Sequence, residues 1–387
     1  AARMTAAPLA SAAALAPDIR ARAEAIERGR RLPADLAAQL AAAGLFRMLV
    51  PRSLGGLELA PAPMLATLET VGAADASVGW CVMIGATTAV VAAYLPADVA
   101  REIYGAPGTI TGGVFAPLGR AVVDGDQYRL SGRWQWASGS ANCHWLMGGS
   151  VILDDGTPRC LPNGAPDARL LLFPAERATL IDTWHVSGLC GTGSGDMAVE
   201  GLRVPLAHAV SLMVDAPREA GALYRFPVFG LLALGIAAVM LGNAGAAVTD
   251  LVELAGGKQP QGSRKVLAER AVAQSELAQA AAALRAARAL FYETVESAWA
   301  AACAGDPLDV ATRAGLRLAA THATRTAADV ARVMYDLGGG SAVFARSPLQ
   351  RRFRDAHVGT QHLMVSPATW ELTGRVLMGL PTDPTQL

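Results

Sequence analysis

The sequence has few charged residues and no excess of either sign. Charged side chains make up 17% of its 387 residues, and 33 Lys and Arg are balanced by 33 Asp and Glu. A nucleic-acid-binding protein needs a cationic surface to neutralise phosphates, so this balance argues against that class. Hydrophobic residues make up 52% of the chain, which is too many for a disordered protein. These numbers indicate a folded protein of two or three domains.

Cysteine is also scarce, and the cysteines form no C-x-x-C pair. Their odd number and scattered positions are typical of reduced thiols, not of a disulfide framework or a zinc site, and we expect no metal. The cysteines are Cys81, Cys143, Cys160, Cys190 and Cys303. The N-terminal residues do not show the basic region followed by an apolar core that is typical of a secretory signal, so we expect a cytoplasmic protein.

Several common site signatures are missing as well. Gly191, Gly193 and Gly195 form a G-x-G-x-G run, but Asp196 stands where a dinucleotide fingerprint next requires glycine. The sequence has no Walker loop, no G-x-S-x-G elbow and no H-E-x-x-H motif. It therefore predicts neither a self-sufficient nicotinamide enzyme nor a serine hydrolase.

Two long runs carry no charge, one between Asp75 and Asp98 and one between Arg225 and Asp250. Each is long enough to cross a bilayer. Both contain several glycines and hydroxyl residues, and neither has the basic cluster that sets the orientation of a membrane span. A helix that is apolar all round is also typical of the centre of a large soluble bundle, so we interpret both as buried helices, away from any membrane.

The hydrophobic period changes twice along the chain. It is helical up to Gly105, and between Gly108 and Pro205 it becomes short β-rich runs separated by Asp-Gly turns. From Arg225 the helical period returns, and it predicts helices over 264–301, 308–337 and 349–378.

The predicted fold is therefore α+β, in three domains. We expect an N-terminal α-helical domain over 1–107, a middle antiparallel β domain of barrel-like form over 108–212, and a C-terminal four-helix bundle over 213–387.

Three segments are richer in polar and aromatic residues than a core requires. In the first, Trp134 and Trp136 lie two residues apart, so they are expected to share one sheet face, with Ser138 following where the strand opens into a turn. A planar cofactor would suit that face, and ordinary strand packing explains the pattern equally well.

The other two segments are rich in glycine. Residues 188–196 combine glycines with hydroxyls, which lets backbone N–H groups approach a ligand, although a plain surface loop has the same composition. Gly338 to Gly340 precede a basic segment and suit a phosphate cradle or a helix C-cap. His357 and His362 lie about 140° apart around a helix, so they are not a metal pair and are expected to have separate roles.

These residues carry a resemblance that covers nearly the whole chain. The domain order, Trp136-Ala137-Ser138, the glycine loop ending in Asp196, Leu337-Gly338-Gly339 and the pair Arg354-Asp355 resemble the acyl-CoA dehydrogenase superfamily of flavoproteins. The resemblance implies that Ser138 hydrogen-bonds the reactive side of a flavin ring and that the β domain covers one face of that ring.

A dehydrogenase of this family needs a carboxylate base after the Arg-Asp pair, and here that base position falls on Leu363. The segment 354–367, with His357, His362 and Pro367, is instead similar to the two-component (group D) flavin-dependent monooxygenases. This resemblance implies an oxygenase component that takes reduced flavin from a separate NAD(P)H-dependent flavin reductase. Through a flavin hydroperoxide formed with O2, it would hydroxylate a phenol-like aromatic or related small molecule. It also implies a homotetramer.

The expected site residues follow from the resemblance. His362 and Ser138 are the expected catalytic residues, His362 because an imidazole can donate to a peroxide oxygen or accept a phenolic proton near its pKa. The residues expected around the flavin, FMN or FAD, are Trp136, Ser138, Phe115, Gly193, Ser194, Arg264, Gly338, Gly339 and Gly340. Those expected in the substrate pocket are Trp80, His144 and His357.

The pattern leaves two other functions open. One is an acyl-CoA dehydrogenase-like oxidoreductase or an N-oxygenase of the same fold, and the other is a non-catalytic binding protein. The identity of the substrate base, His362 or another group, is also open.

Overall fold

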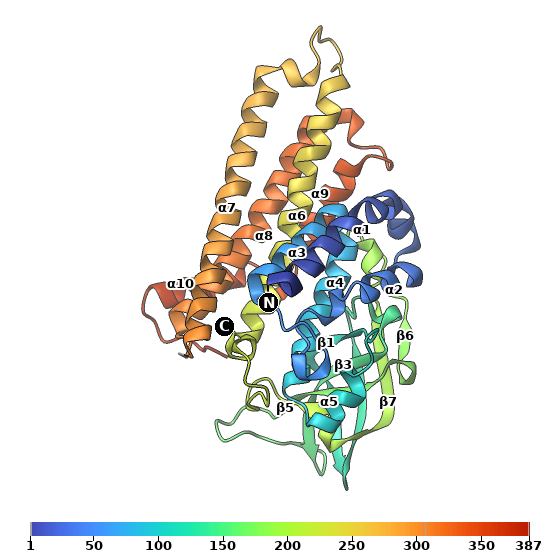
Figure 1. Ribbon diagram of the computed structural model, residues 1–387, viewed down its shortest axis with the longest axis vertical. Coiled ribbons are helices and arrows are strands. Elements are labelled where there is room, and N and C mark those ends of the chain that lie inside the picture. Colours follow the sequence, from blue (N-terminus) through green and yellow to red (C-terminus); the bar gives the residue numbers. More distant parts are fainter. Residues whose placement is uncertain (1, 306, 386) are drawn as a thin grey trace.

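A computed structural model describes residues 2–305, 307–385 and 387 of the chain. Helices come first, a sheet follows, and longer helices complete the chain, which confirms the predicted order (Figure 1). The helices before the sheet are α1 (Ala2–Gly29), α2 (Ala34–Ala42), α3 (Pro61–Ala74), α4 (Ala76–Thr88) and α5 (Ala97–Tyr104). The helices after it are α6 (Val228–Gly257), α7 (Ala271–Ala304), α8 (Val310–Gly338), α9 (Pro348–Gly359) and α10 (Ala368–Leu377).

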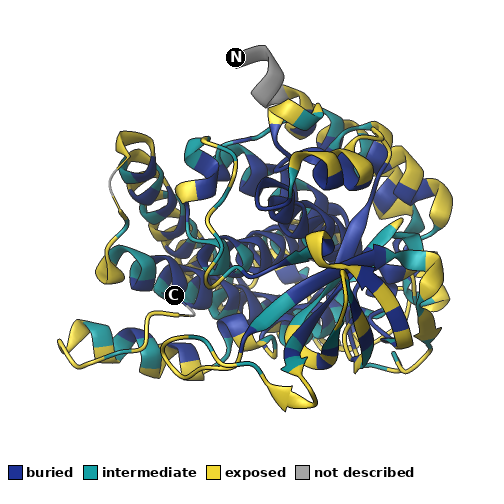
Figure 2. Ribbon diagram, turned by 90° about the horizontal axis from the view of Figure 1, so that it is seen from below, coloured by how far each residue is buried: buried dark blue, intermediate teal, exposed yellow. Residues whose placement is uncertain are grey.

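The two uncharged runs form core helices. The first is α4 with the 3-10 turn after it, Ala89–Ala93, and the second is α6. Each is long and apolar enough to cross a membrane, yet 94% of the most apolar window of the first and 83% of that of the second is buried inside the fold. Figure 2 shows this dark buried centre surrounded by helices whose outer faces are exposed. The runs are therefore apolar because they lie between other elements of the same chain.

Glycines let these core helices pack at very short distances. α6 packs against α3, and a Cβ at Gly242 would overlap the carbonyl oxygen of Glu69 on α3. A Cβ at Gly72 on α3 would lie 2.6 Å from the carbonyl oxygen of Val239 on α6. Gly242, one of the glycines that argue against a membrane span in the second run, thus has a packing role.

The sheet lies beside the helices and provides a second hydrophobic core. Its strands are β1 (Thr111–Asp124), β2 (Gln127–Trp134), β3 (Trp145–Asp154), β4 (Thr157–Pro158), β5 (Ala168–Pro174), β6 (Thr179–Ile181), β7 (Asp196–Pro205) and β8 (Ala209–Val210). Their order is β6-β7-β2-β1-β3-β5-β8, with β4 paired to β3. The strands pair antiparallel as expected except for β1 and β3, which are parallel, so the sheet is mixed.

The expected shared face of Trp134 and Trp136 is wrong. Strand β2 ends at Trp134, whose ring is fully buried in the sheet's core and whose Nε1 donates to the Gly149 carbonyl at 2.7 Å. Trp136 lies beyond the strand with a left-handed φ of 64° and is 64% exposed. Two-residue periodicity holds only within a strand, and the left-handed residue turns the second ring outward.

The C-terminal helices differ from prediction at two breaks. Residues 264–270 lie outside α7 in the connection from α6, where the Leu267 N–H donates to the Lys258 carbonyl at 2.7 Å. The predicted helix over 349–378 is two helices, α9 and α10, separated by the 3-10 turn η11 (Leu363–Val365). Pro367 contributes to the second break, because proline disfavours helical backbone in the residue before it, and Ser366 has an extended ψ of 166°. The proposed domain boundaries fall in the α5–β1 and β8–α6 connections.

Two alanine substitutions on α6 test the close helix packing. Gly242→Ala should lower the free energy of unfolding by about 1–3 kcal/mol, because its methyl group must displace the backbone of α3. Gly245→Ala, one turn away, meets only the end of the Arg288 side chain at 3.6 Å and should raise that free energy by about 0.5–1 kcal/mol. Urea unfolding of both variants measures the difference, and equal effects would contradict the packing.

Candidate active site

Side chains from three separate parts of the chain meet where the sheet joins the helices. Trp80 on α4 donates from Nε1 to the Ser138 hydroxyl, in the turn after β2, at 3.2 Å. The ring of Trp80 also meets the ring of His362, just before η11, edge to face at a centroid distance of 5.8 Å. Trp80 and Ser138 are each 6% exposed. Trp80 therefore connects the two residues that the sequence assigns to catalysis.

Backbone turns on both sides fix the position of Ser138. Gly139 has a left-handed φ of 70°, and the Ala137 N–H donates to the Gly195 carbonyl at 2.9 Å. Trp136 precedes this turn with its large apolar ring exposed. Such an exposed aromatic ring, next to a buried hydroxyl, is a surface suited to cover a planar ligand.

The loop 188–195 packs against Ser138 and is held by α9. Leu189 has a left-handed φ of 52°, and its N–H donates to the Asp355 carboxylate at 2.6 Å. A Cβ at Gly188 would overlap the backbone of Arg354, and one at Gly191 would overlap Ile26 on α1. The glycines that the sequence showed as a possible ligand loop thus also allow this loop to lie between two helices.

Hydroxyl groups connect this loop to Ser138. The Oγ atoms of Ser138 and Ser194 lie 2.6 Å apart, and the Oγ of Ser194 lies 2.6 Å from Oγ1 of Thr192. Oγ1 of Thr192 donates to the Leu189 carbonyl at 2.8 Å. All three hydroxyl residues are buried. A continuous hydrogen-bonded chain therefore runs from Trp80 to Leu189.

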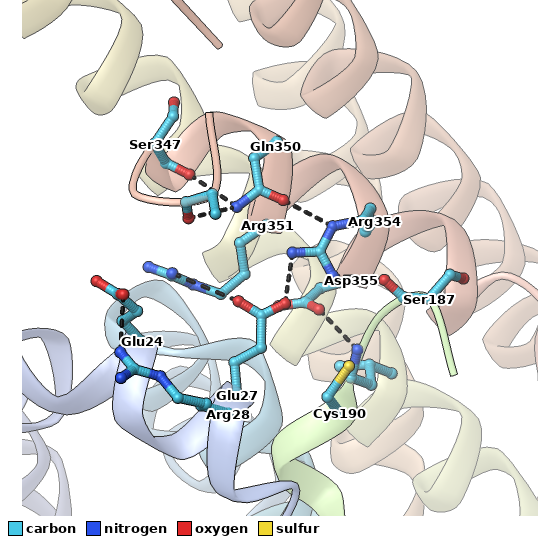
Figure 3. A network of polar contacts seen from close by, with 12 residues as sticks. Glu24, Glu27, Arg28, Ser187, Cys190, Ser347, Gln350, Arg351, Arg354 and Asp355 are labelled. Atoms are coloured by element: carbon cyan, nitrogen blue, oxygen red, sulfur yellow. Dashed lines mark hydrogen bonds and ion pairs between the residues drawn. The ribbon is translucent and has the colours of Figure 1, made fainter. Parts of the chain in front are cut away.

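Asp355 is the buried centre of a polar network between α9 and α1 (Figure 3). Burial, helped by the nearby charge of Asp75, raises the pKa of Asp355 to about 7, although the Leu189 N–H and two arginines oppose the shift. Arg354 pairs with Glu27 on α1, and Arg351 lies 3.8 Å from the same carboxylate. Arg351 and Arg354 therefore join α9 to α1, and Arg354 also joins α9 to the segment before the loop by donating to the Ser187 carbonyl.

His362 is held as a neutral hydrogen-bond donor. Its Nδ1 accepts from the Met364 N–H at 3.2 Å, so the neutral ring carries its proton on Nε2. Desolvation by the surrounding protein, helped by the charge of the buried Arg317 on α8, lowers the pKa of His362 to about 4. The expectation of an imidazole pKa near working pH is therefore wrong. In this state His362 can donate from Nε2 but has no free nitrogen to accept a proton.

Arg317 is a residue that the sequence did not single out. It is one of several arginines on α8, and its Nη2 donates to the Met364 carbonyl at 3.1 Å, beside the turn that holds His362. Arg317 differs from the other arginines of α8 in being buried. No sequence motif shows which arginine of an amphipathic helix is buried.

The remaining predicted residues are spread over the fold. Gly193, like Ser194, is in the loop beside Ser138 and has a left-handed φ of 56°, and Phe115 is partly buried on β1. His144 is exposed and accepts from the Ile110 N–H at 3.1 Å. His357 donates to the Phe353 carbonyl on its own helix at 2.8 Å.

Gly338 to Gly340 and Arg264 lie elsewhere. The Gly338 carbonyl accepts from Lys258, at the far ends of α6 and α8 from the sheet, and Arg264 is exposed in the connection that follows Lys258 (Figure 1). Among the described contacts, none joins these residues to Ser138 within one chain.

Fold and site together define a flavoprotein of the acyl-CoA dehydrogenase fold. The model of the acyl-CoA dehydrogenase N-terminal domain matches residues 10–98, and that of the C-terminal domain matches residues 234–367. The crystal structure of the HsaA monooxygenase from Mycobacterium tuberculosis is similar over 99% of this chain and 100% of its own, with a TM-score of 0.90 and 27% identity. The structure of XiaF from Streptomyces in complex with FADH2 and glycerol is similar over 99% of this chain and 97% of its own. The TM-score is 0.90 and the sequence identity is 25%.

Sequence relatives define the class further. An indole-3-acetate monooxygenase of Pseudomonas putida is 36% identical over 93% of this chain and 90% of its own length. HsaA of M. tuberculosis, the oxygenase subunit of a flavin-dependent monooxygenase, is 29% identical over 96% of this chain and 95% of its own length. The chain belongs to the flavin-dependent monooxygenases of the acyl-CoA dehydrogenase fold, as an oxygenase component that works with a separate flavin reductase. The predicted family, enzyme class and flavin dependence are confirmed, and the non-catalytic alternative is excluded.

The neutral state of His362 predicts a pH dependence of stability. Between about pH 6.5 and pH 4 the unfolded chain binds a proton at this residue and the folded chain does not, so stability falls as the pH decreases through this window. His362→Asn keeps an oxygen that can accept from Met364 but does not titrate. Relative to this variant, the wild type should lose about 2 kcal/mol of unfolding free energy between about pH 7.5 and pH 5.

Urea unfolding at the two pH values measures this loss. Asp355 titrates in the same range, but it is present in both proteins, so its contribution cancels. Parallel pH profiles of the two proteins would contradict a neutral, partly buried His362.

Proposed function

We propose that this oxygenase hydroxylates an electron-rich aromatic small molecule beside Trp80, Ser138 and His362. The observation that carries the proposal is their meeting at one place, with a neutral Nε2–H donor on one side and a buried hydroxyl on the other. In the net reaction one oxygen atom of O2 enters a C–H bond of the substrate. The other leaves as water, and the two electrons come from reduced flavin.

The residues around Ser138 suit the ring end of a flavin. Trp136 offers an exposed aromatic face, and Ser138 offers a hydroxyl beside it. The bound flavin would supply the electrons and activate O2. Both FMN and FAD fit this part of the site, because neither Trp136 nor Ser138 discriminates between their different tails.

The residues expected at the flavin phosphates call for at least a second copy of the chain, in line with the homotetramer that the resemblance implies. If Gly338 to Gly340 and Arg264 bind the phosphates of a flavin whose ring lies at Ser138, we propose that they belong to a second copy, because within one chain these ends of α6 and α8 lie away from the sheet (Figure 1). We also propose that His357 and His144 line the substrate pocket. A second copy of the chain would then form part of the outer wall of this pocket.

Indole-3-acetate is the first substrate to test. Relatives named indole-3-acetate monooxygenase are 36% and 32% identical to this chain. An electron-rich ring such as an indole or a phenol needs a donor that stabilises the departing oxygen, and the Nε2–H of His362 is a fixed donor of this kind. We place the reaction in the cytoplasm, with an NAD(P)H-dependent flavin reductase as the source of electrons.

A dehydrogenase reaction is not favoured by the same geometry. Leu363, at the position of the family's base, is 66% exposed and has no acid group. The carboxylate of Asp355 accepts from the backbone of Leu189 and is buried between elements of the fold. An α-proton of a thioester would therefore find no carboxylate base in this segment.

The activity test uses the purified protein with an unrelated NAD(P)H-dependent flavin reductase. With FMN or FAD, O2 and indole-3-acetate, mass spectrometry should show a product that has gained one oxygen atom, at a rate that depends on the oxygenase. Consumption of NAD(P)H with hydrogen peroxide as the sole product, for indole-3-acetate and for simple phenols, would contradict the proposal.

Loss of the donor at His362 should separate substrate oxygenation from flavin oxidation. His362→Ala should lower the rate of product formation about 10²–10³-fold, as for the loss of one preorganised donor, while hydrogen peroxide formation continues. His185→Ala, which alters an exposed histidine elsewhere, is the matched control and should retain normal rates. A fully active His362→Ala enzyme would show that His362 is not catalytic.

A further inference from the structure

The hydrogen-bonded chain behind Ser138 has only one possible direction. The Leu189 carbonyl can only accept, so the one hydroxyl hydrogen of Thr192 lies on the 2.8 Å contact between them. Thr192 must then accept from Ser194. With its own hydrogen used in this way, Ser194 must accept from Ser138.

This direction uses the only hydrogen of the Ser138 hydroxyl. The same oxygen already accepts from Nε1 of Trp80, which leaves it one lone pair. Toward a ligand in the site, the Ser138 hydroxyl is therefore an acceptor and not a donor.

The neighbouring backbone offers no substitute donor. The Ala137 N–H donates to the Gly195 carbonyl and the Ser138 N–H donates to the Trp136 carbonyl, each at 2.9 Å. The hydroxyl chain is also buried along its whole length, so water does not readily reverse it.

We infer that the chain Trp80–Ser138–Ser194–Thr192–Leu189 makes the site selective for reduced over oxidised flavin. The inference rests on the proposed function, in which the flavin ring lies at Ser138, and on the resemblance, which implies that Ser138 faces the reactive side of that ring, where the nitrogen N5 lies. In reduced flavin N5 carries a hydrogen and can donate to Ser138. In oxidised flavin N5 has a lone pair instead, which would face the lone pair of Ser138 without a hydrogen between them.

Such selectivity suits an oxygenase component that receives its flavin already reduced. Ser138 would offer no hydrogen bond to the oxidised flavin that remains after turnover, which would favour its release. Ser194 and Thr192 are then positioning and specificity-determining residues, since they act by directing the hydrogen of Ser138.

Binding measurements on two variants test the direction of the chain. In Ser194→Ala the hydrogen of Ser138 loses its acceptor and can turn toward oxidised N5. Thr192→Val has nearly the same shape and releases the hydrogen of Ser194, which lets the chain reverse. Either variant should lower the ratio of the Kd of oxidised flavin to that of reduced flavin about tenfold, the size of one buried hydrogen bond. For this two-electron couple the change equals about 30 mV in the potential of the bound flavin.

The Kd values are measured by anaerobic ultrafiltration of the full chain with FMN and with FAD, each oxidised or reduced with dithionite. Ser140→Ala, a buried hydroxyl in the same turn but outside the chain, is the matched control and should keep the wild-type ratio. A cooperative unfolding transition in urea establishes that each variant is folded. If Ser194→Ala does not fold, the isosteric Thr192→Val provides the test.

The outcomes separate this inference from the proposed function. A folded variant that binds reduced flavin with an unchanged ratio overturns the hydroxyl-chain inference alone. A wild-type protein that binds neither reduced FMN nor reduced FAD overturns the proposed function and the inference with it. A tenfold lower ratio in Ser194→Ala and Thr192→Val, with Ser140→Ala unchanged, supports the inference.

Discussion

The hydrogen bond from the Leu189 N–H to the buried carboxylate of Asp355 is the contact on which the site depends. It holds the loop after β6 against α9, and thereby sets the sheet against the C-terminal helices. Leu189 also accepts from Thr192, which begins the hydroxyl chain to Ser138 and Trp80. Buried polar contacts between parts of the chain that are far apart in sequence thus fix the position of Ser138 and Trp80.

A second constraint is the burial of Trp80 and Ser138. The core helices α4 and α6 are mainly apolar and pack in this region, and desolvation keeps His362 neutral. A neutral imidazole with Nδ1 already occupied is a donor of fixed direction. The protein therefore combines a buried acceptor at Ser138 with a partly buried donor at His362. This pair suits a reaction in which oxygen is transferred and reactive species must be kept from water.

Local pattern in the sequence was enough to predict the order of helices and sheet, the burial of the uncharged helices and the enzyme class. The periodicity of α6 and the resemblance around Ser138 and His362 carried these conclusions. The exposure of Trp136 could not be predicted, because it depends on a left-handed residue beyond the end of β2. The parallel pairing of β1 and β3 likewise depends on the return of the chain in space.

Long-range burial accounts for the other differences. Arg317 and Asp355 matter because of what surrounds them, and neither has a motif that expresses burial. The pKa of His362 moved far from its ordinary value for the same reason. The separation of Gly338 from Ser138 is also a property of the fold, since both lie in glycine-rich segments that look equally suited to one ligand.

The most direct test of the account is a crystal structure of the full chain grown and kept without oxygen in the presence of reduced flavin. The account predicts the flavin ring against Trp136, with N5 within hydrogen-bond distance of the Ser138 hydroxyl and His362 on the side of the substrate. A flavin bound elsewhere in a well-ordered structure, with Ser138 touching only Trp80 and Ser194, would contradict it.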